Sequence, residues 1–225
     1  MFSLAGGKRE QFIDFRLYLI TDRKLFTDRA ALFGGVGNAL RAGVKAVQLR
    51  EKDLPIRELL DLAYGMRELT ARYGARLFVN DRIDVAMCVN ADGVHLGQAG
   101  IPVHAVRGMV GKTMMIGAST HNLDEASMAE KEGADFITFG PLWHTESKRK
   151  YGEPVGIEAL RSVKRRTSLA VFGIGGIKTD NIKDVINSGA RGIALISGIL
   201  GNADIKGAAE KFLREVEAKS KPQSE

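Results

Sequence analysis

Eight short apolar runs recur along the chain at nearly regular intervals, and this recurrence constrains the fold more than any other feature. Each run is five or six residues long, is rich in Val, Ile, Leu and Phe, and ends at or just before a glycine or a polar residue. Runs of this length and composition are typical of buried strands. We expect strands at 16–20, 46–50, 76–80, 93–97, 114–119, 136–140, 169–173 and 192–197.

Helical stretches separate these runs. In the segment 56–73, Leu59, Ala63 and Met66 recur at spacings of three and four residues, which places them on one face of a helix. Strands that alternate with helices are typical of a parallel sheet with right-handed crossovers. Further helices are expected at 123–132, 179–188 and 205–217.

A weaker repeat indicates how the sheet closes. Related segments precede every second strand, and Gly43, Gly133 and Gly189 in three of them suit the left-handed residue that ends a helix. Four units of about 45 to 55 residues close into an eight-stranded barrel, whereas an open doubly wound sheet needs no even repeat. The predicted fold class is a single (β/α)8 TIM barrel over 16–217, with an N-terminal extension at 1–15 and a disordered tail at 218–225.

The composition narrows the class of protein. A hydrophobic content of 44% and a charged content of 27% are typical of a soluble globular chain. No run of about 18 apolar residues occurs, which predicts no membrane association. The first 15 residues lack the apolar core of a signal peptide. Cys88 is the only cysteine, which excludes internal disulfides and indicates a cytoplasmic location.

The formal net charge of +6 is compatible with binding of nucleic acid, with a small anionic ligand, or with solubility alone. Lys and Arg are spread along the chain, the aromatic residues are not interleaved with them, and the densest basic run, 148–150, occupies one loop. This distribution disfavours nucleic acid. The expected partners are small phosphorylated substrates, and the sequence leaves the oligomeric state open, a homo-oligomer included.

The motif QLREK at the end of the second strand places Gln48, Arg50 and Lys52 on one side of that strand. In a (β/α)8 barrel the loops after the strands form the active face. Asp81, after the third strand, offers an internal ion-pair partner, and an unpaired buried charge costs several kcal/mol. A polyanionic ligand is the favoured explanation, because one carboxylate cannot satisfy all the nearby cations, which are Arg50, Lys52, Arg82 and Lys148.

Glycine-rich turns follow the seventh and eighth strands, at 173–176 and 196–198. Glycine lets backbone N–H groups approach an anion, and these two loops of such barrels often hold a phosphate. One such turn alone would indicate only a tight turn, whereas two favour a phosphate site. The loop after the sixth strand is about sixteen residues long, which also indicates function.

Candidate metal and acid–base residues are few. An Asp at a strand end, such as Asp81, is a weak indication of Mg2+, which needs only one or two carboxylates beside phosphate and water. The four histidines lack zinc-site spacing. His121 is the best placed for acid–base work, because it follows the end of the fifth strand; the other three are His95, His104 and His144.

These motifs, in this order, resemble the thiamine-phosphate synthase family over nearly the whole chain. The stretches that carry the resemblance are QLREK at 48–52, NDR at 80–82, ADGVHLGQ at 91–98, STH at 119–121, TESK at 145–148, GIGGI at 173–177 and IS at 196–197. The resemblance implies that a hydroxymethylpyrimidine diphosphate is coupled to a thiazole phosphate, with release of diphosphate. Such enzymes ionise the pyrimidine C–O bond and stabilise the leaving diphosphate.

The resemblance also implies roles for individual residues. It assigns catalysis to Arg50, Lys52, Lys148 and His121, and one Mg2+, held largely through the substrate diphosphate, to Asp81. It assigns the pyrimidine diphosphate to Gln48, Arg50, Lys52, Asn80, Ser119 and Lys148. It assigns the thiazole phosphate to Thr145, Glu146, Ser147, Gly176, Ile196 and Ser197.

One departure from the family pattern concerns the metal. The family usually has Gly-Gln-Glu-Asp after the fourth strand, and its Asp is a second Mg2+ ligand, whereas this chain has Gly100 at that position. Ser147 stands where Thr is usual. The loss favours a related family, the thiazole tautomerases, which would use His121 as acid and base without Mg2+. The intact QLREK and NDR motifs favour the synthase, and a non-catalytic binder of the same phosphates is a weaker alternative.

Overall fold

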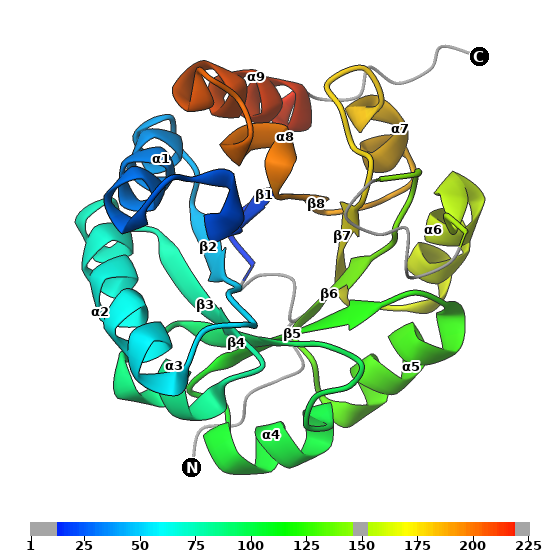
Figure 1. Cartoon of the computed structure of the whole chain (residues 1–225). Coiled ribbons are helices and arrows are strands. Elements are labelled where there is room, and N and C mark those ends of the chain that lie inside the picture. Colours follow the sequence, from blue (N-terminus) through cyan, green and yellow to red (C-terminus); the bar gives the residue numbers. More distant parts are fainter. Residues whose placement is uncertain (1–12, 146–152, 219–225) are drawn as a thin grey trace.

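The computed structural model describes residues 13–145 and 153–218, and these form one closed barrel. The strands follow one another around the ring in chain order, each parallel to its neighbours, and β8 pairs with β1. Helices surround the strands, as Figure 1 shows. The predicted single (β/α)8 TIM barrel is therefore confirmed.

The strands are β1 (Leu17–Ile20), β2 (Ala46–Leu49), β3 (Arg76–Asn80), β4 (Gly93–Leu96), β5 (Met115–Thr120), β6 (Phe136–Phe139), β7 (Ala170–Ile174) and β8 (Gly192–Leu195). The helices are the 3-10 helix η2 (Arg23–Leu25) and α1 (Arg29–Arg41), α2 (Ile56–Arg72), α3 (Ile83–Cys88), α4 (Val103–Val110), α5 (Leu123–Glu132), α6 (Gly156–Arg166), α7 (Ile182–Asn187), α8 (Ser197–Leu200) and α9 (Ile205–Glu217). Within the two described ranges, no helix is both long and apolar enough to cross a bilayer.

Most elements lie where the sequence predicts them, and β3, α5 and α9 have the predicted bounds. The helix α7 starts at Ile182 rather than at residue 179. A local turn precedes it, because the Asn181 side chain accepts a hydrogen bond from the Lys178 N–H at 2.9 Å. The predicted eighth strand also ends earlier, at Leu195, and Ser197 instead begins the short helix α8.

Aromatic side chains fill the interior of the barrel. The ring centroids of Tyr18 and Phe78 lie 5.3 Å apart, and those of Phe136 and Phe172 lie 5.6 Å apart. Phe15, which precedes β1, stacks on Phe172 at 5.1 Å and is only 2% exposed. The segment before the first strand thus contributes to the core, and this packed layer supports the polar residues nearer the strand ends.

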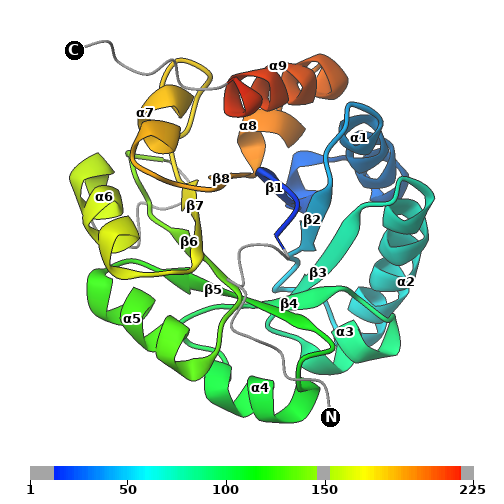
Figure 2. The same ribbon diagram turned by 180° about the vertical axis from the view of Figure 1, so that it is seen from behind.

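A second apolar layer lies between the strands and the surrounding helices. Figure 2 shows this ring of helices around the strands from the opposite side. Val47 and Leu49 belong to it, whereas Gln48 between them points inward. The alternation of side chains along β2 therefore separates a helix-facing row from an interior row. The three glycines predicted to end helices are confirmed in the left-handed region, with φ of 112° at Gly43, 99° at Gly133 and 87° at Gly189.

Glycines in the strands make room for the interior rings, and Gly117 in β5 is the clearest case. A Cβ at Gly117 would lie 2.6 Å from Nδ1 of His95 and against the ring of Phe136. We expect Gly117→Ala to lower the free energy of unfolding by about 1–3 kcal/mol, because neither buried ring has space to withdraw. Urea unfolding measures the change.

The matched control is Gly34→Ala on the exposed side of α1, where nothing lies within 4 Å of the added Cβ. This substitution should raise stability by up to about 1 kcal/mol, because alanine is the better helix former. Equal stability of the two variants would contradict the role assigned to Gly117.

Candidate functional site

The QLREK segment carries three side chains with different surroundings. Gln48 is 1% exposed, and its Nε2 donates to the hydroxyl of Tyr18 at 3.1 Å inside the barrel. Lys52 Nζ lies 3.2 Å from Oδ2 of Asp81, after the next strand. The half-buried Arg50 has no ion pair among the described residues, and its backbone N–H donates to Oγ1 of Thr21 at 3.0 Å. The structure thus pairs one of the two cations and leaves the guanidinium of the other available for an anion.

Asp81 is held firmly at the end of β3. Its Oδ1 accepts the Gly97 N–H at 2.7 Å, and its Oδ2 accepts the Asn80 amide at 2.7 Å. Burial alone would raise the pKa of this carboxyl, but the bond from Gly97 and the ammonium of Lys52 outweigh burial, so the pKa lies below its ordinary value. The backbone of Asp81 is left-handed, with φ of 56°, a conformation that Asp tolerates better than most residues. The carboxylate is therefore ionised and fixed in direction.

Arg82 does not join this group. Its Nε and Nη2 bind the two carboxylate oxygens of Asp84, two residues further along the chain, and the Nε–Oδ1 distance is 2.9 Å. Both side chains are exposed. The prediction that Arg82 is one of the cations that require an anionic ligand is wrong, because its guanidinium is already paired with Asp84.

Ser119 belongs to a polar group inside the barrel that was not predicted from the sequence. Its hydroxyl lies 3.1 Å from Nε2 of His95, and Oγ1 of Thr138 lies 3.4 Å from the same nitrogen. His95 is 2% exposed and lies against the rings of Tyr18 and Phe136. Its position between Val94 and Leu96, which point outward, was the available signal, because alternation along β4 turns His95 inward.

His121 is held at the start of α5. Its Nδ1 lies 3.0 Å from Oε2 of Glu125, and the same oxygen accepts the His121 N–H at 2.7 Å. The side chain is 30% exposed. The carboxylate orients the imidazole and leaves Nε2 as the nitrogen that is free to exchange a proton, which suits an acid–base role without requiring one.

The glycine turns after β7 and β8 lie close to the loop that follows β6. Gly175 and Gly176 have φ of 93° and 66°. A Cβ at Gly175 would lie 2.6 Å from Pro141, and one at Gly176 would lie 2.6 Å from Trp143. Glycine is required here both for its backbone conformation and for this close approach.

The N–H groups of Gly175, Gly176 and Ser197 have no hydrogen-bond acceptor among the described residues, so they are free to bind an anion. Ile196 caps the short helix α8 that Ser197 begins. Thr145 is the last described residue before the gap at 146–152 in the loop after β6. The remaining predicted residues of this loop, Glu146, Ser147 and Lys148, lie outside the described residues.

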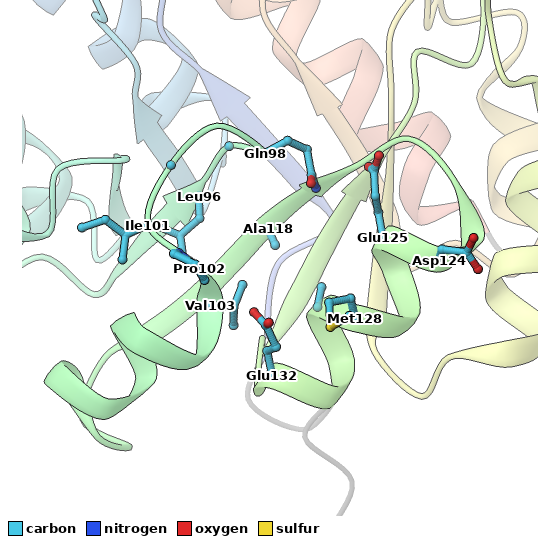
Figure 3. Close-up of a pocket in the computed structure, with 13 residues that line it drawn as sticks. Leu96, Gln98, Ile101, Pro102, Val103, Ala118, Asp124, Glu125, Met128 and Glu132 are labelled. Carbon is cyan, nitrogen blue, oxygen red and sulfur yellow. The ribbon is translucent and has the colours of Figure 1, made fainter.

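A groove of about 400 Å³ lies beside the site, and Figure 3 shows that its lining comes from β4 and the loop after it, from β5, and from α4 and α5. Gly97 and Gly100 line it on the side of Asp81, and Ile101 and Met128 are exposed within it. The groove does not include the predicted residues of β2 or β3. We therefore regard it as a neighbour of the site rather than its centre.

The surroundings of Asp81 indicate how well this chain fits a Mg2+ ion. No cluster of three or more His, Cys, Asp or Glu side chains suited to a metal occurs in the described part of the chain. Gly100 faces Asp81, since a Cβ there would lie 3.0 Å from Oδ1, and it is not one of the left-handed glycines. One carboxylate fits a Mg2+ ion whose other ligands are substrate phosphate and water, but not a site built from protein alone.

Comparisons with known proteins agree with this arrangement. A model of the family described as thiamine monophosphate synthase matches residues 17–199. A thiamine-phosphate synthase from Moorella thermoacetica is 44% identical over 200 residues, which are 89% of this chain and 94% of the relative. Thiamine-phosphate synthase 1 from Aquifex aeolicus is 43% identical over 198 residues, 88% of this chain and 91% of the relative.

A solved structure, the thiamine phosphate pyrophosphorylase from Pyrococcus furiosus, superposes with a TM-score of 0.82 at 38% identity. The match covers 90% of this chain and 96% of that one. The family model and the sequence relatives thus span the strand ends that carry the candidate residues. The chain belongs to the thiamine monophosphate synthase family.

Proposed function

We propose that this barrel is a transferase that couples hydroxymethylpyrimidine diphosphate to a thiazole phosphate and releases diphosphate, with the strand-end residues in the roles given below. Family membership supports the activity. The single observation that best supports the roles is that Lys52 is paired with Asp81, whereas the guanidinium of Arg50, two residues earlier, has no ion pair among the described residues. A cation in that state is suited to receive the charge of a leaving diphosphate.

Charge stabilisation is the main task of the site. When the pyrimidine C–O bond ionises, negative charge develops on the diphosphate, and fixed cations and N–H donors lower the energy of that state. Arg50, Lys52 and the amide of Asn80 supply these donors, and Lys148 supplies another from the loop after β6. The thiazole nitrogen then captures the pyrimidine cation, so the reaction needs no enzyme nucleophile.

Two further groups of residues orient the substrates. Gln48 and Ser119 hold the pyrimidine. The hydrogen bonds between Gln48 and Tyr18 and between Ser119 and His95, inside the barrel, fix the orientation of the Gln48 and Ser119 side chains. The residues that hold the thiazole phosphate are Thr145, Glu146, Ser147, Gly176, Ile196 and Ser197. Asp81 is the residue that would hold Mg2+, which when bound would neutralise charge on the diphosphate.

The partners of the chain are therefore small phosphorylated substrates. A single cysteine, which is exposed and free, suits the reducing cytoplasm that we propose as its location.

The experiment that tests the function incubates the protein with the pyrimidine diphosphate, the thiazole phosphate and Mg2+, and measures thiamine phosphate. We expect its formation, and we expect His121→Ala to retain the coupling activity at a reduced rate. A protein that makes no thiamine phosphate at any Mg2+ concentration, but isomerises a carboxythiazole phosphate in a manner that His121→Ala abolishes, would be a tautomerase instead.

Replacing Gly100 with Asp should restore a second acidic ligand. A side chain at this position is directed at Asp81, so the new carboxylate would face the existing one, and only a cation between them relieves their repulsion. We expect a lower Mg2+ concentration for half-maximal rate and tighter Mg2+ binding without substrate, measured by calorimetry. Gly100→Asn is the control, since it adds similar bulk without the charge. An identical Mg2+ dependence in wild type and Gly100→Asp would contradict this assignment.

A further inference from the structure

Glu51 lies between the two cations of QLREK, yet its side chain points away from them into the protein and is only 2% exposed. Its Oε1 accepts the hydroxyl of Thr21 at 2.6 Å, and both oxygens accept the N–H of Arg23 at 3.1 Å. A carboxylate so deeply buried is expensive unless it is fully hydrogen-bonded. Its bonds lead to Thr21 and Arg23, just after β1 and 30 and 28 residues earlier in the chain.

Thr21 connects this carboxylate to Arg50. The side chain is 0% exposed, and Oγ1 donates to Glu51 while it accepts the Arg50 N–H at 3.0 Å. A hydroxyl has a single proton, so donation to Glu51 fixes its rotation and turns a lone pair toward Arg50. The Thr21 N–H also donates to the carbonyl of Gln48 at 2.9 Å, which joins the ends of β1 and β2.

We propose that Glu51 is a positioning residue for the diphosphate: acting through the Thr21 hydroxyl, it fixes the backbone of Arg50 and so determines where the side chains of Arg50 and Lys52 lie. This inference rests on the proposed function, because it assigns Glu51 to the residues that hold the leaving group. It makes no contact with substrate.

The electrostatics indicate that the ionised carboxylate does not add to the stability of the fold at neutral pH. Burial raises the pKa of Glu51 above its ordinary value of 4.5, against the bonds from Thr21 and Arg23, and the neighbouring Asp22 adds to the rise. The folded state therefore holds the proton more tightly than the unfolded state does. Stability from this group is present at low pH and is lost as the pH rises past about 4.5 toward the folded pKa.

Arg23 does not offset this cost with a close ion pair. Its Nε lies 3.9 Å from Glu51, whereas its Nη2 lies 3.0 Å from the exposed Asp53, which also binds Lys24 at 3.1 Å. Asp53 thus touches the same arginine without touching Thr21, which makes Asp53→Asn the matched control for Glu51→Gln.

The test measures binding of inorganic diphosphate by calorimetry, steady-state kinetics and thermal unfolding at neutral pH. For Glu51→Gln and Thr21→Val we expect about tenfold weaker diphosphate binding and lower kcat, with the KM for the thiazole phosphate unchanged. The Tm of Glu51→Gln should be equal to or above that of wild type. Thr21→Ser, which keeps the hydroxyl, should recover most of what Thr21→Val loses, and Asp53→Asn should behave like wild type.

A double variant separates positioning from a merely structural role. Because Glu51 acts through both Arg50 and Lys52, Arg50→Ala combined with Glu51→Gln should lose less than the sum of the two single losses. The inference would be overturned if the losses of the two single variants add up in the double variant, if Glu51→Gln binds diphosphate like wild type, or if Glu51→Gln fails to fold. If Arg50→Ala itself leaves diphosphate binding unchanged, the proposed function fails. If Arg50→Ala weakens diphosphate binding but Glu51→Gln does not, only the role of Glu51 fails.

Discussion

Replacing Arg50 with Ala is expected to lower turnover by roughly tenfold or more while the barrel remains folded. Arg50 is half-buried and has no ion pair within the described residues, so removal of its side chain breaks no salt bridge in this part of the protein. What it removes is a fixed positive charge that the leaving diphosphate would otherwise contact. Single-turnover kinetics and the Tm of the variant measure the two effects separately.

Arg82→Ala is the matched control for this prediction. Both variants delete an arginine side chain, but the side chain of Arg82 is paired with Asp84 on an exposed surface. An exposed pair of this kind contributes at most about 1 kcal/mol to stability, and its loss should leave turnover close to wild type. Equal losses in the two variants, or normal turnover in Arg50→Ala, would remove Arg50 from the site.

Replacing Asp81 with Asn is expected to lower turnover by at least about tenfold and to raise the Mg2+ concentration required for half-maximal rate. Asn tolerates the left-handed backbone at this position, where φ is 56°, so the substitution tests charge with little added strain. The amide cannot accept all the bonds that Oδ1 and Oδ2 receive from Gly97, Asn80 and Lys52. Rates over a Mg2+ titration measure the change.

The pH dependence of stability provides an independent check on Asp81. The pKa of its carboxyl is lowered from 3.8, so its stabilising contribution is present above that value and is lost as the pH falls through the folded pKa. The difference in unfolding free energy between wild type and Asp81→Asn should therefore be constant from pH 5 to pH 8 and shrink below about pH 4. A difference that changes near neutrality would show that another group titrates with Asp81.

The sequence by itself determined the barrel. Strand and helix periodicities are local properties, and eight alternating segments with left-handed glycines such as Gly43 and Gly133 admit few topologies. The strand-end rule then indicated the candidate site, because the loops after parallel strands gather at one end of a closed barrel. Gln48, Asp81 and Gly176 could be named for this reason without any knowledge of their contacts.

Only the tertiary structure decided which charges are satisfied. Lys52 binds Asp81 and Arg82 binds Asp84, whereas the sequence presented both cations as equal candidates for a ligand. Likewise, Glu51 binds Thr21 thirty residues away. The pairing of charges depends on side-chain direction and burial over a few ångströms. Both are set by the packing of whole strands rather than by the local sequence pattern. The motif QLREK therefore indicated a candidate site, but not which of its charged side chains bind one another and which remain without a partner.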